Sequence, residues 1–240
     1  MVRVVLLLTV FVSLMQAARP PGPPRGLRAP SGLTIDVTLP SISRHVYAPG
    51  NLPEHVRFTD REAGVCSTVF RCSARFRARW TEENGRPSAA VISDIAITTA
   101  VDIQIHVRAD SGADILAHEE THRRISEYYY ARAEEVARRV ATPLLGRTVP
   151  FDRSGGAAEP VMAPLEQELI AAFMWETSAR SGYAQERFDE ITDHGRKPIA
   201  NAVAMERALR EEAAHWEKVK HQPPPRRQYQ ITSERSLRHP

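Results

Sequence analysis

The sequence predicts an α+β fold, with a small β-rich N-terminal half followed by a helical part. Up to about Val107, short stretches of apolar residues alternate with polar ones, which is the period of a β-strand. After Asp110 the apolar residues recur about every 3.6 residues, as they do along a helix. The expected helices follow the strands instead of alternating with them, and this order favours the α+β class.

The first strand is predicted from about Leu33, because Leu33, Ile35, Val37 and Leu39 alternate with mostly polar residues. Similar patterns predict further short strands at 65–70, 74–80, 91–98 and 103–107. The residues at 83–87, Glu-Asn-Gly-Arg-Pro, are typical of a turn between two of these strands.

The first helix is expected to begin at a cap formed by Asp110 or Ser111, to run to about Leu145 and to be closed by Gly146. Three more helices are expected, at about 164–175, 183–193 and 198–222. Gly195 suits the position just after the end of the third of them.

The N-terminus predicts export. Arg3 is followed by an apolar run from Val4 to Leu14 and then by small residues, as in a signal peptide of residues 1–18. A membrane anchor is the competing interpretation, but the run is shorter than the roughly 20 apolar residues that a span needs. We therefore expect a periplasmic or secreted protein without a stable membrane span after signal cleavage.

The remaining chain divides into three parts. Residues 19–30 form a Pro-rich leader, 31–220 are expected to form a single domain, and 221–240 read as a basic, disordered tail. A net charge of only +3 over 240 residues argues against nucleic acid as a partner, because such binding needs a concentrated basic face.

The two cysteines, Cys66 and Cys72, lie six positions apart. In an oxidising compartment they could close a small disulfide loop. A thiolate metal pair is the weaker alternative, because the spacing is not C-x-x-C and the chain has no second pair.

The residues Ala117-His118-Glu119-Glu120-Thr121-His122 carry the strongest chemical signal. Residues four apart lie on one face of a helix, so His118 and His122 can converge on one zinc ion. Glu119 would then act as general base toward a zinc-activated water. A pair of satisfied core histidines is the alternative, since both share a helical stripe with apolar residues such as Ile125.

The segment from Leu116 to His122, with its Tyr-Tyr-Ala-Arg continuation, resembles a family of predicted secreted bacterial zinc-dependent proteases, a domain of unknown function. A second signature of that family, Tyr-Asp-x-x-Thr-x-His-Gly, is similar to residues 188–195 here, with Phe188 in place of tyrosine. The likeness covers about 114–216. It implies a zincin-like metallohydrolase, with the protease activity itself resting on the motif.

A catalytic zinc site needs a third protein ligand. The resemblance reaches His194 and favours it, although a histidine at a helix end can also interact with the helix dipole. Asp189, Asp193 and Glu176 are the carboxylate alternatives, and Asp189 could instead orient a ligand histidine. The expected function is hydrolysis of peptide bonds in a peptide or protein substrate. A non-catalytic metal-binding or interaction module of the cell envelope is the second hypothesis.

Overall fold

A computed structural model describes residues 32–48, 51, 63–83, 86–149, 151–152, 159–160 and 162–222. The expected signal peptide, the Pro-rich leader and all but the first two residues of the basic tail lie outside the described residues. The described part has mixed α and β content, as expected.

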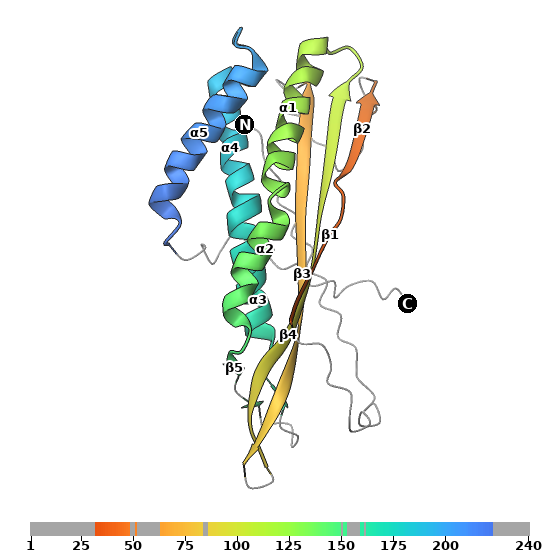
Figure 1. The fold of residues 1–240 in the computed structure, drawn as a ribbon. Helices are drawn as coiled ribbons and strands as arrows, with labels where there is room; N and C mark the ends of the chain where they lie inside the picture. The colour runs from red at the N-terminus through yellow and green to blue at the C-terminus, as the bar shows by residue number, and fades with distance from the viewer. Residues whose placement is uncertain are drawn as a thin grey trace.

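Two long antiparallel strands, β3 (Gly64–Glu83) and β4 (Arg86–Arg108), form the backbone of the sheet. Their ladder runs from Gly64 opposite Val107 to Glu83 opposite Arg86, and its register shifts twice, after Arg77 and after Thr81. Four strands expected as separate short pieces are therefore parts of two long ones, and residues 84–85 of the expected turn lie outside the described residues. Figure 1 shows this hairpin extending past the ends of the helices.

The second edge of β4 is shared by three shorter strands, because β3 occupies the first edge along its whole length. Both β1 (Gly32–Val37) and β2 (Ser41–Tyr47) run parallel to β4, beside 94–99 and 102–108. The short β5 (Thr148–Val149) pairs antiparallel with Ala90 and Val91. The sheet is thus mixed in direction.

Strands also occur among the helices, so the expectation of a purely N-terminal β region needs correction. Besides β5, the short β6 (Phe151–Asp152) and β7 (Glu159–Pro160) form a separate two-stranded ladder. Two-residue strands give no periodic signal, which is why the sequence pattern did not reveal them.

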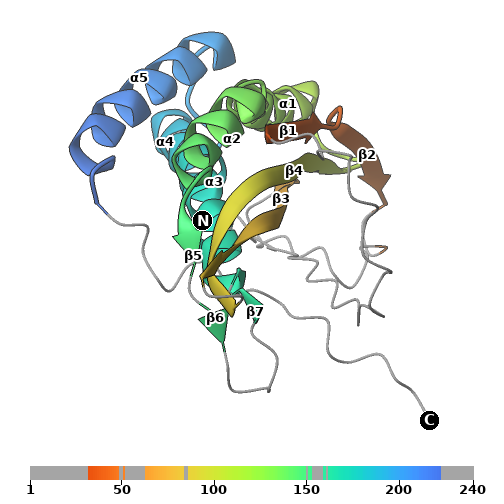
Figure 2. The same ribbon diagram turned by 60° about the horizontal axis from the view of Figure 1, so that its bottom comes forward.

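The helices lie on one side of β3 and β4 in both ribbon views (Figures 1 and 2). The first expected helix is broken at Ala131 into α1 (Ala113–Tyr130) and α2 (Ala133–Ala141), followed by a 3-10 turn, η1 (Thr142–Leu144). The next two are continuous through a π-helical turn, η2: α3 (Ala163–Met174), η2 (Trp175–Ala179) and α4 (Arg180–Thr192). The last helix, α5 (Asn201–Val219), packs on α4 and α1.

The core lies between the sheet and the helices. Alternate residues of β4, such as Ile97, Ile103 and Ile105, are almost completely buried on the face that the helices cover. They meet Ile125 of α1 and Phe173 of α3 within one apolar cluster. The core therefore fixes the distance of α1 from the sheet.

The expected disulfide between Cys66 and Cys72 is wrong. Both cysteines are free and buried, and both lie on β3. Six residues of a strand span about 20 Å, whereas the Cα atoms of a disulfide lie about 4.4–6.8 Å apart. A single straight strand cannot close this loop.

Within the described part of the chain, no helix is both long enough and apolar enough to cross a membrane.

Candidate metal centre

Helix α1 presents His118, Glu119 and His122 on its buried side. The two imidazoles are one helical turn apart, and their Nε2 atoms approach to 3.2 Å. This is the convergence that the i, i+4 spacing predicts.

Asp189 of α4 completes the cluster. Its Oδ1 atom lies 3.1 Å from His118 Nε2 and 3.0 Å from His122 Nε2. Among the described residues, these three side chains form a buried group that could hold a metal ion. Tetrahedral ligands about 2.0–2.1 Å from one ion lie about 3.3 Å from each other, close to the separations seen here.

The charges of the cluster are coupled. Burial raises the pKa of Asp189, but the two histidines outweigh burial and hold that pKa well below its usual range. Burial lowers the pKa of His122, yet the charge and hydrogen bond of Asp189 reverse this and raise it. For His118 burial prevails and lowers its pKa. The carboxylate is therefore ionised, as a ligand must be.

Unsatisfied polar atoms gather at this centre. Seven buried side-chain nitrogen or oxygen atoms of the described residues lack a hydrogen-bond partner, and five of them belong to the centre and its neighbours: His118 Nδ1, His122 Nδ1, Gln185 Oε1, Asp189 Oδ2 and His194 Nδ1. Buried polar groups are normally paired. They are other atoms than the converging Nε2 and Oδ1, so they show that the polar network around the centre is incomplete, while the case for a cation rests on the converging atoms.

Phe188 of α4 packs against the imidazole rings of His118 and His122. Its ring stacks on His118 with centroids 4.8 Å apart and meets His122 edge to face at 5.1 Å. It occupies the place where the second family signature has tyrosine, and here it restricts the orientation of both ligands.

His194 lies beside the cluster instead of within it. Its Nδ1 atom is 3.7 Å from Asp189 Oδ1, and its side chain is 33% exposed. The chain leaves α4 through three consecutive left-handed residues, at Asp193, His194 and Gly195. This turn places Gly195 so close to His118 that an added Cβ would be 3.4 Å from the imidazole, so the turn encloses that ring.

The other carboxylate alternatives lie outside the centre. Asp193 is engaged by Arg196 at 2.9 Å, and Glu176 forms an ion pair with Arg139. Of the three carboxylates considered from the sequence, only Asp189 reaches both histidines.

Glu119 is buried beside the first residue of β3. A Cβ atom added to Gly64 would lie 2.8 Å from Glu119 Cγ and 3.0 Å from its Oε1, so only glycine leaves room for this side chain. Burial and the nearby charge of Glu119 raise the pKa of the Cys66 thiol. The carboxylate thus lies between the metal helix and the sheet.

Three comparisons with known proteins were made. No family model, curated protein or solved structure matches it. The resemblance described above therefore remains an expectation, and the function has to be argued from the centre itself.

Sequence reasoning missed Ser126, whose hydroxyl donates to the backbone oxygen of His122 at 3.1 Å. Ser126 lies one turn beyond His122 on the same helix, and a serine at that position gives no distinctive sequence signal. Tyr183 of α4 stacks on His215 with ring centroids 4.2 Å apart.

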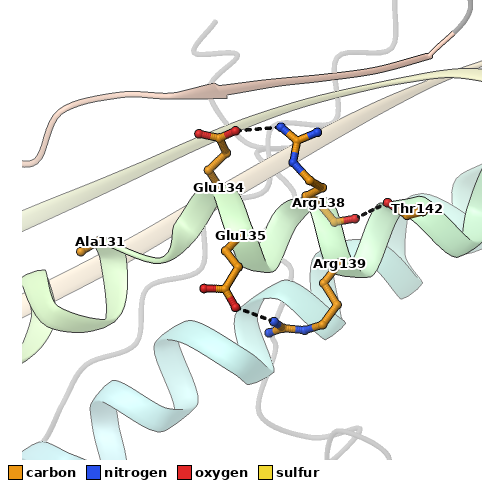
Figure 3. A pocket seen from close by; sticks show the side chains of 6 residues that line it. All are labelled: Ala131, Glu134, Glu135, Arg138, Arg139 and Thr142. Atoms are coloured by element: carbon orange, nitrogen blue, oxygen red, sulfur yellow. Dashed lines mark hydrogen bonds and ion pairs between the residues drawn. The ribbon is translucent and has the colours of Figure 1, made fainter.

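A hollow on α2 differs from the metal centre in how its charged side chains are paired. It is lined by Glu134, Glu135, Arg138 and Arg139, which form two exposed ion pairs along the helix (Figure 3). Its charges are already paired at i, i+4 spacing, so it offers no convergent set of free donors.

Proposed function

We propose that the protein is an exported zinc-dependent metallohydrolase that cleaves peptide bonds. The observation that carries the proposal is the buried convergence of His118, His122 and Asp189, with Glu119 next to the first histidine. Two imidazoles and one carboxylate form a common ligand set of catalytic zinc sites. Bound zinc would supply Lewis acidity and lower the pKa of a water to about 7.

In this proposal each residue of the chain has a distinct task. His118 Nε2, His122 Nε2 and Asp189 Oδ1 would hold the metal ion. The carboxylate of Glu119 would accept a proton from the water that attacks the substrate carbonyl and would pass it to the leaving amine. His194, which lies beside the cluster with a partly exposed side chain, would donate a hydrogen bond to the substrate carbonyl oxygen and would not be needed to hold the metal.

The finer expectations from the sequence belong to the same proposal. They include a zincin-like helix with His118, Glu119 and His122. They also include membership of the family of predicted secreted zinc proteases and a periplasmic or secreted location.

One observation favours a second candidate, a metal-binding module without catalysis. The side chains of His118, His122 and Asp189 are only 5%, 2% and 4% exposed. A closed site of this kind is typical of structural zinc, whereas a catalytic site keeps one position open. The two candidates share the ligands and differ in what Glu119 does.

The first experiment measures zinc by elemental analysis. We expect about one zinc per chain in the parent, its loss in His118→Ala and Asp189→Asn, and its retention in His194→Ala. His215→Ala, a histidine stacked on Tyr183 away from the centre, is the matched control. No zinc in the reconstituted parent would overturn the proposal. Loss of zinc in His194→Ala would make His194 a ligand.

The second experiment tests catalysis with a peptide library read by mass spectrometry. Glu119→Gln should keep zinc and lower the cleavage rate at least about 100-fold, because general-base catalysis contributes roughly 10²–10⁴. Glu127→Gln, a partly exposed residue on the same helix, should cleave like the parent. A zinc-loaded parent that cleaves no library peptide would favour the non-catalytic module.

A further inference from the structure

Three arginines form a row on β3, the outer strand of the sheet. Arg75, Arg77 and Arg79 occupy alternate positions of this strand, and all three side chains are exposed. Side chains at alternate positions lie on one face of a strand, about 6.6 Å apart along it. The intervening Phe76 and Ala78 pack against the apolar core, so the arginines lie on the face turned away from the helices (Figure 2).

The row lacks the carboxylate partners that other arginines have. Most arginine side chains in the described part of the chain form an ion pair with an aspartate or a glutamate. Arg75, Arg77 and Arg79 form none with any described residue. Asp94 lies opposite Arg77 in the ladder, but its carboxylate accepts a hydrogen bond from the backbone N–H of Gly32 at 3.1 Å. The row therefore presents unpaired positive charge to solvent.

The outer edge of β3 is also without a strand partner. Among the described strands, β3 pairs only with β4, and no other backbone hydrogen bond in the described part of the chain involves residues 64–79. An edge of this kind can pair with a further strand. We term residues 73–79 the arginine edge. Thr68, which contacts the metal helix, lies seven residues before Arg75, or about 23 Å along the strand, so the arginine edge is separate from the metal centre.

We propose that the arginine edge binds an extended peptide chain with acidic residues at alternate positions. A strand added beside β3 would place its side chains opposite those of β3, with Cβ atoms about 4.5–5.5 Å apart. Its alternate side chains repeat at the same spacing of about 6.6 Å. Carboxylates at these positions would meet the three guanidinium groups while the main chain pairs with the free edge. The proposal goes beyond the proposed function and requires no metal.

The charge row argues against two other occupants. In an antiparallel pair of two copies centred on Arg77, Arg75 of one copy would lie opposite Arg79 of the other, and like charges directly opposite each other destabilise a sheet. An anionic lipid surface would attract the arginines but would leave the backbone edge unpaired. The common period of the charges and of an added strand therefore favours an acidic peptide.

Peptide affinity is the first test. Fluorescence anisotropy at low salt compares a labelled, end-blocked peptide of alternating glutamate and valine with an isomer whose glutamates are contiguous. The parent should bind the alternating peptide more tightly. Arg77→Gln should weaken this binding about 2–5-fold, and the triple change Arg75→Gln, Arg77→Gln, Arg79→Gln about 10-fold or more. Arg124→Gln is the matched control, because Arg124 of α1 is exposed and forms no ion pair with a described residue. Equal affinity for both peptides, or parent-like affinity in the triple variant, would overturn the proposal.

Hydrogen exchange of the parent is the second test, and it needs no variant to fold. The alternating peptide should slow the exchange of backbone amides within residues 73–79. The same peptide methylated at alternate backbone nitrogens keeps its carboxylates but loses donors along one edge, so it should bind more weakly and give less protection. Binding to vesicles of anionic phospholipid, with no protection by the peptide, would assign the row to lipid and refute the proposal. A parent that binds neither probe, with a triple variant that self-associates, would leave the arginines as a guard against edge-to-edge pairing and would also refute it.

Discussion

Two buried charged clusters lie between the same helices, and they differ in how completely they are satisfied. The metal centre uses His118 and His122 of α1 with Asp189 of α4. The second cluster, which we term the clamp, joins Tyr129 of α1, Arg180 of α4 and Glu212 of α5. On α1 the clamp begins seven residues, or about two turns, beyond His122.

Every charged group in the clamp is paired with another group of the protein. Arg180 donates to both oxygens of Glu212, at 2.6 and 2.9 Å, and Tyr129 donates to the same carboxylate at 2.7 Å. The guanidinium also lies over the Trp216 ring, 4.7 Å from its centroid. No buried polar atom of Tyr129, Arg180 or Glu212 lacks a partner.

The contrast separates a structural role from a binding role. Buried charges that are fully paired by protein groups cost little further and need no ligand. Buried donors left with vacant lone pairs are costly unless something else satisfies them. Helix α1 thus contributes to a cluster whose charges are paired within the protein and, about two turns earlier, to a set of converging ligand atoms, and only the second has the atoms of a cation site.

The largest expected effect comes from breaking the clamp. Glu212→Gln leaves the guanidinium of Arg180, whose side chain is 14% exposed, without its charge partner. Removing one partner of a buried pair costs about 3–5 kcal/mol of unfolding free energy. Urea denaturation, followed by circular dichroism, measures this loss.

Glu206→Gln is the matched control on the same helix, because Glu206 pairs with Arg210 where both side chains are well exposed. Its stability should stay within about 0.5 kcal/mol of the parent. The folded fraction of Glu212→Gln should still bind zinc. A Glu212→Gln protein as stable as the parent would show that the clamp is not structural.

A smaller effect is expected from adding zinc to the metal-free protein. At a free zinc concentration 100 times Kd, binding to the native state alone adds about 2.7 kcal/mol. For a domain of this size, that shift corresponds to a rise in Tm of roughly 5–10 °C. Differential scanning calorimetry of the parent and of Glu206→Gln should show the rise, and Asp189→Asn should lack it. An equal rise in Asp189→Asn would place the stabilising ion elsewhere.

The contrast also explains which parts of the centre the sequence could predict. His118, Glu119 and His122 lie within one helical turn, so their juxtaposition follows from local geometry alone. Asp189 is 67 residues from His122, and its position depends on how α4 packs against α1. Sequence reasoning could therefore list Asp189 only as an alternative.

Two local features of the backbone also affect where Asp189 and His194 lie, and the sequence pattern does not predict both. The π-helical turn at Trp175–Ala179 changes the phase of the helix that carries Asp189, and no residue pattern announces it. The left-handed residues after Thr192 carry His194 to the rim of the cluster, although the position of Gly195 at the helix end was foreseeable. The alternating patterns of β1 and β4 likewise identified strands but not their parallel pairing, since period two reports the buried face and not the neighbour.

The smallest effect is expected at the cysteines, which lie in the apolar core. Because Cys66 and Cys72 are free, a reducing agent should leave the unfolding free energy unchanged, whereas removal of a disulfide typically costs 2–5 kcal/mol. Burial raises the pKa of Cys72 to about 12 and also raises that of Cys66, so both remain protonated at neutral pH.

The thiolate is the reactive form of cysteine, so the native protein should resist alkylation at pH 8 with or without reductant. Two thiols per chain should react once the protein is unfolded in guanidinium without reductant. Fewer than two reactive thiols per chain would mean that Cys66 and Cys72 form a disulfide in a conformation in which β3 is not formed. Since β3 holds them about 20 Å apart, such pairing would require the ladder with β4 to open, and the sheet under α1 with it.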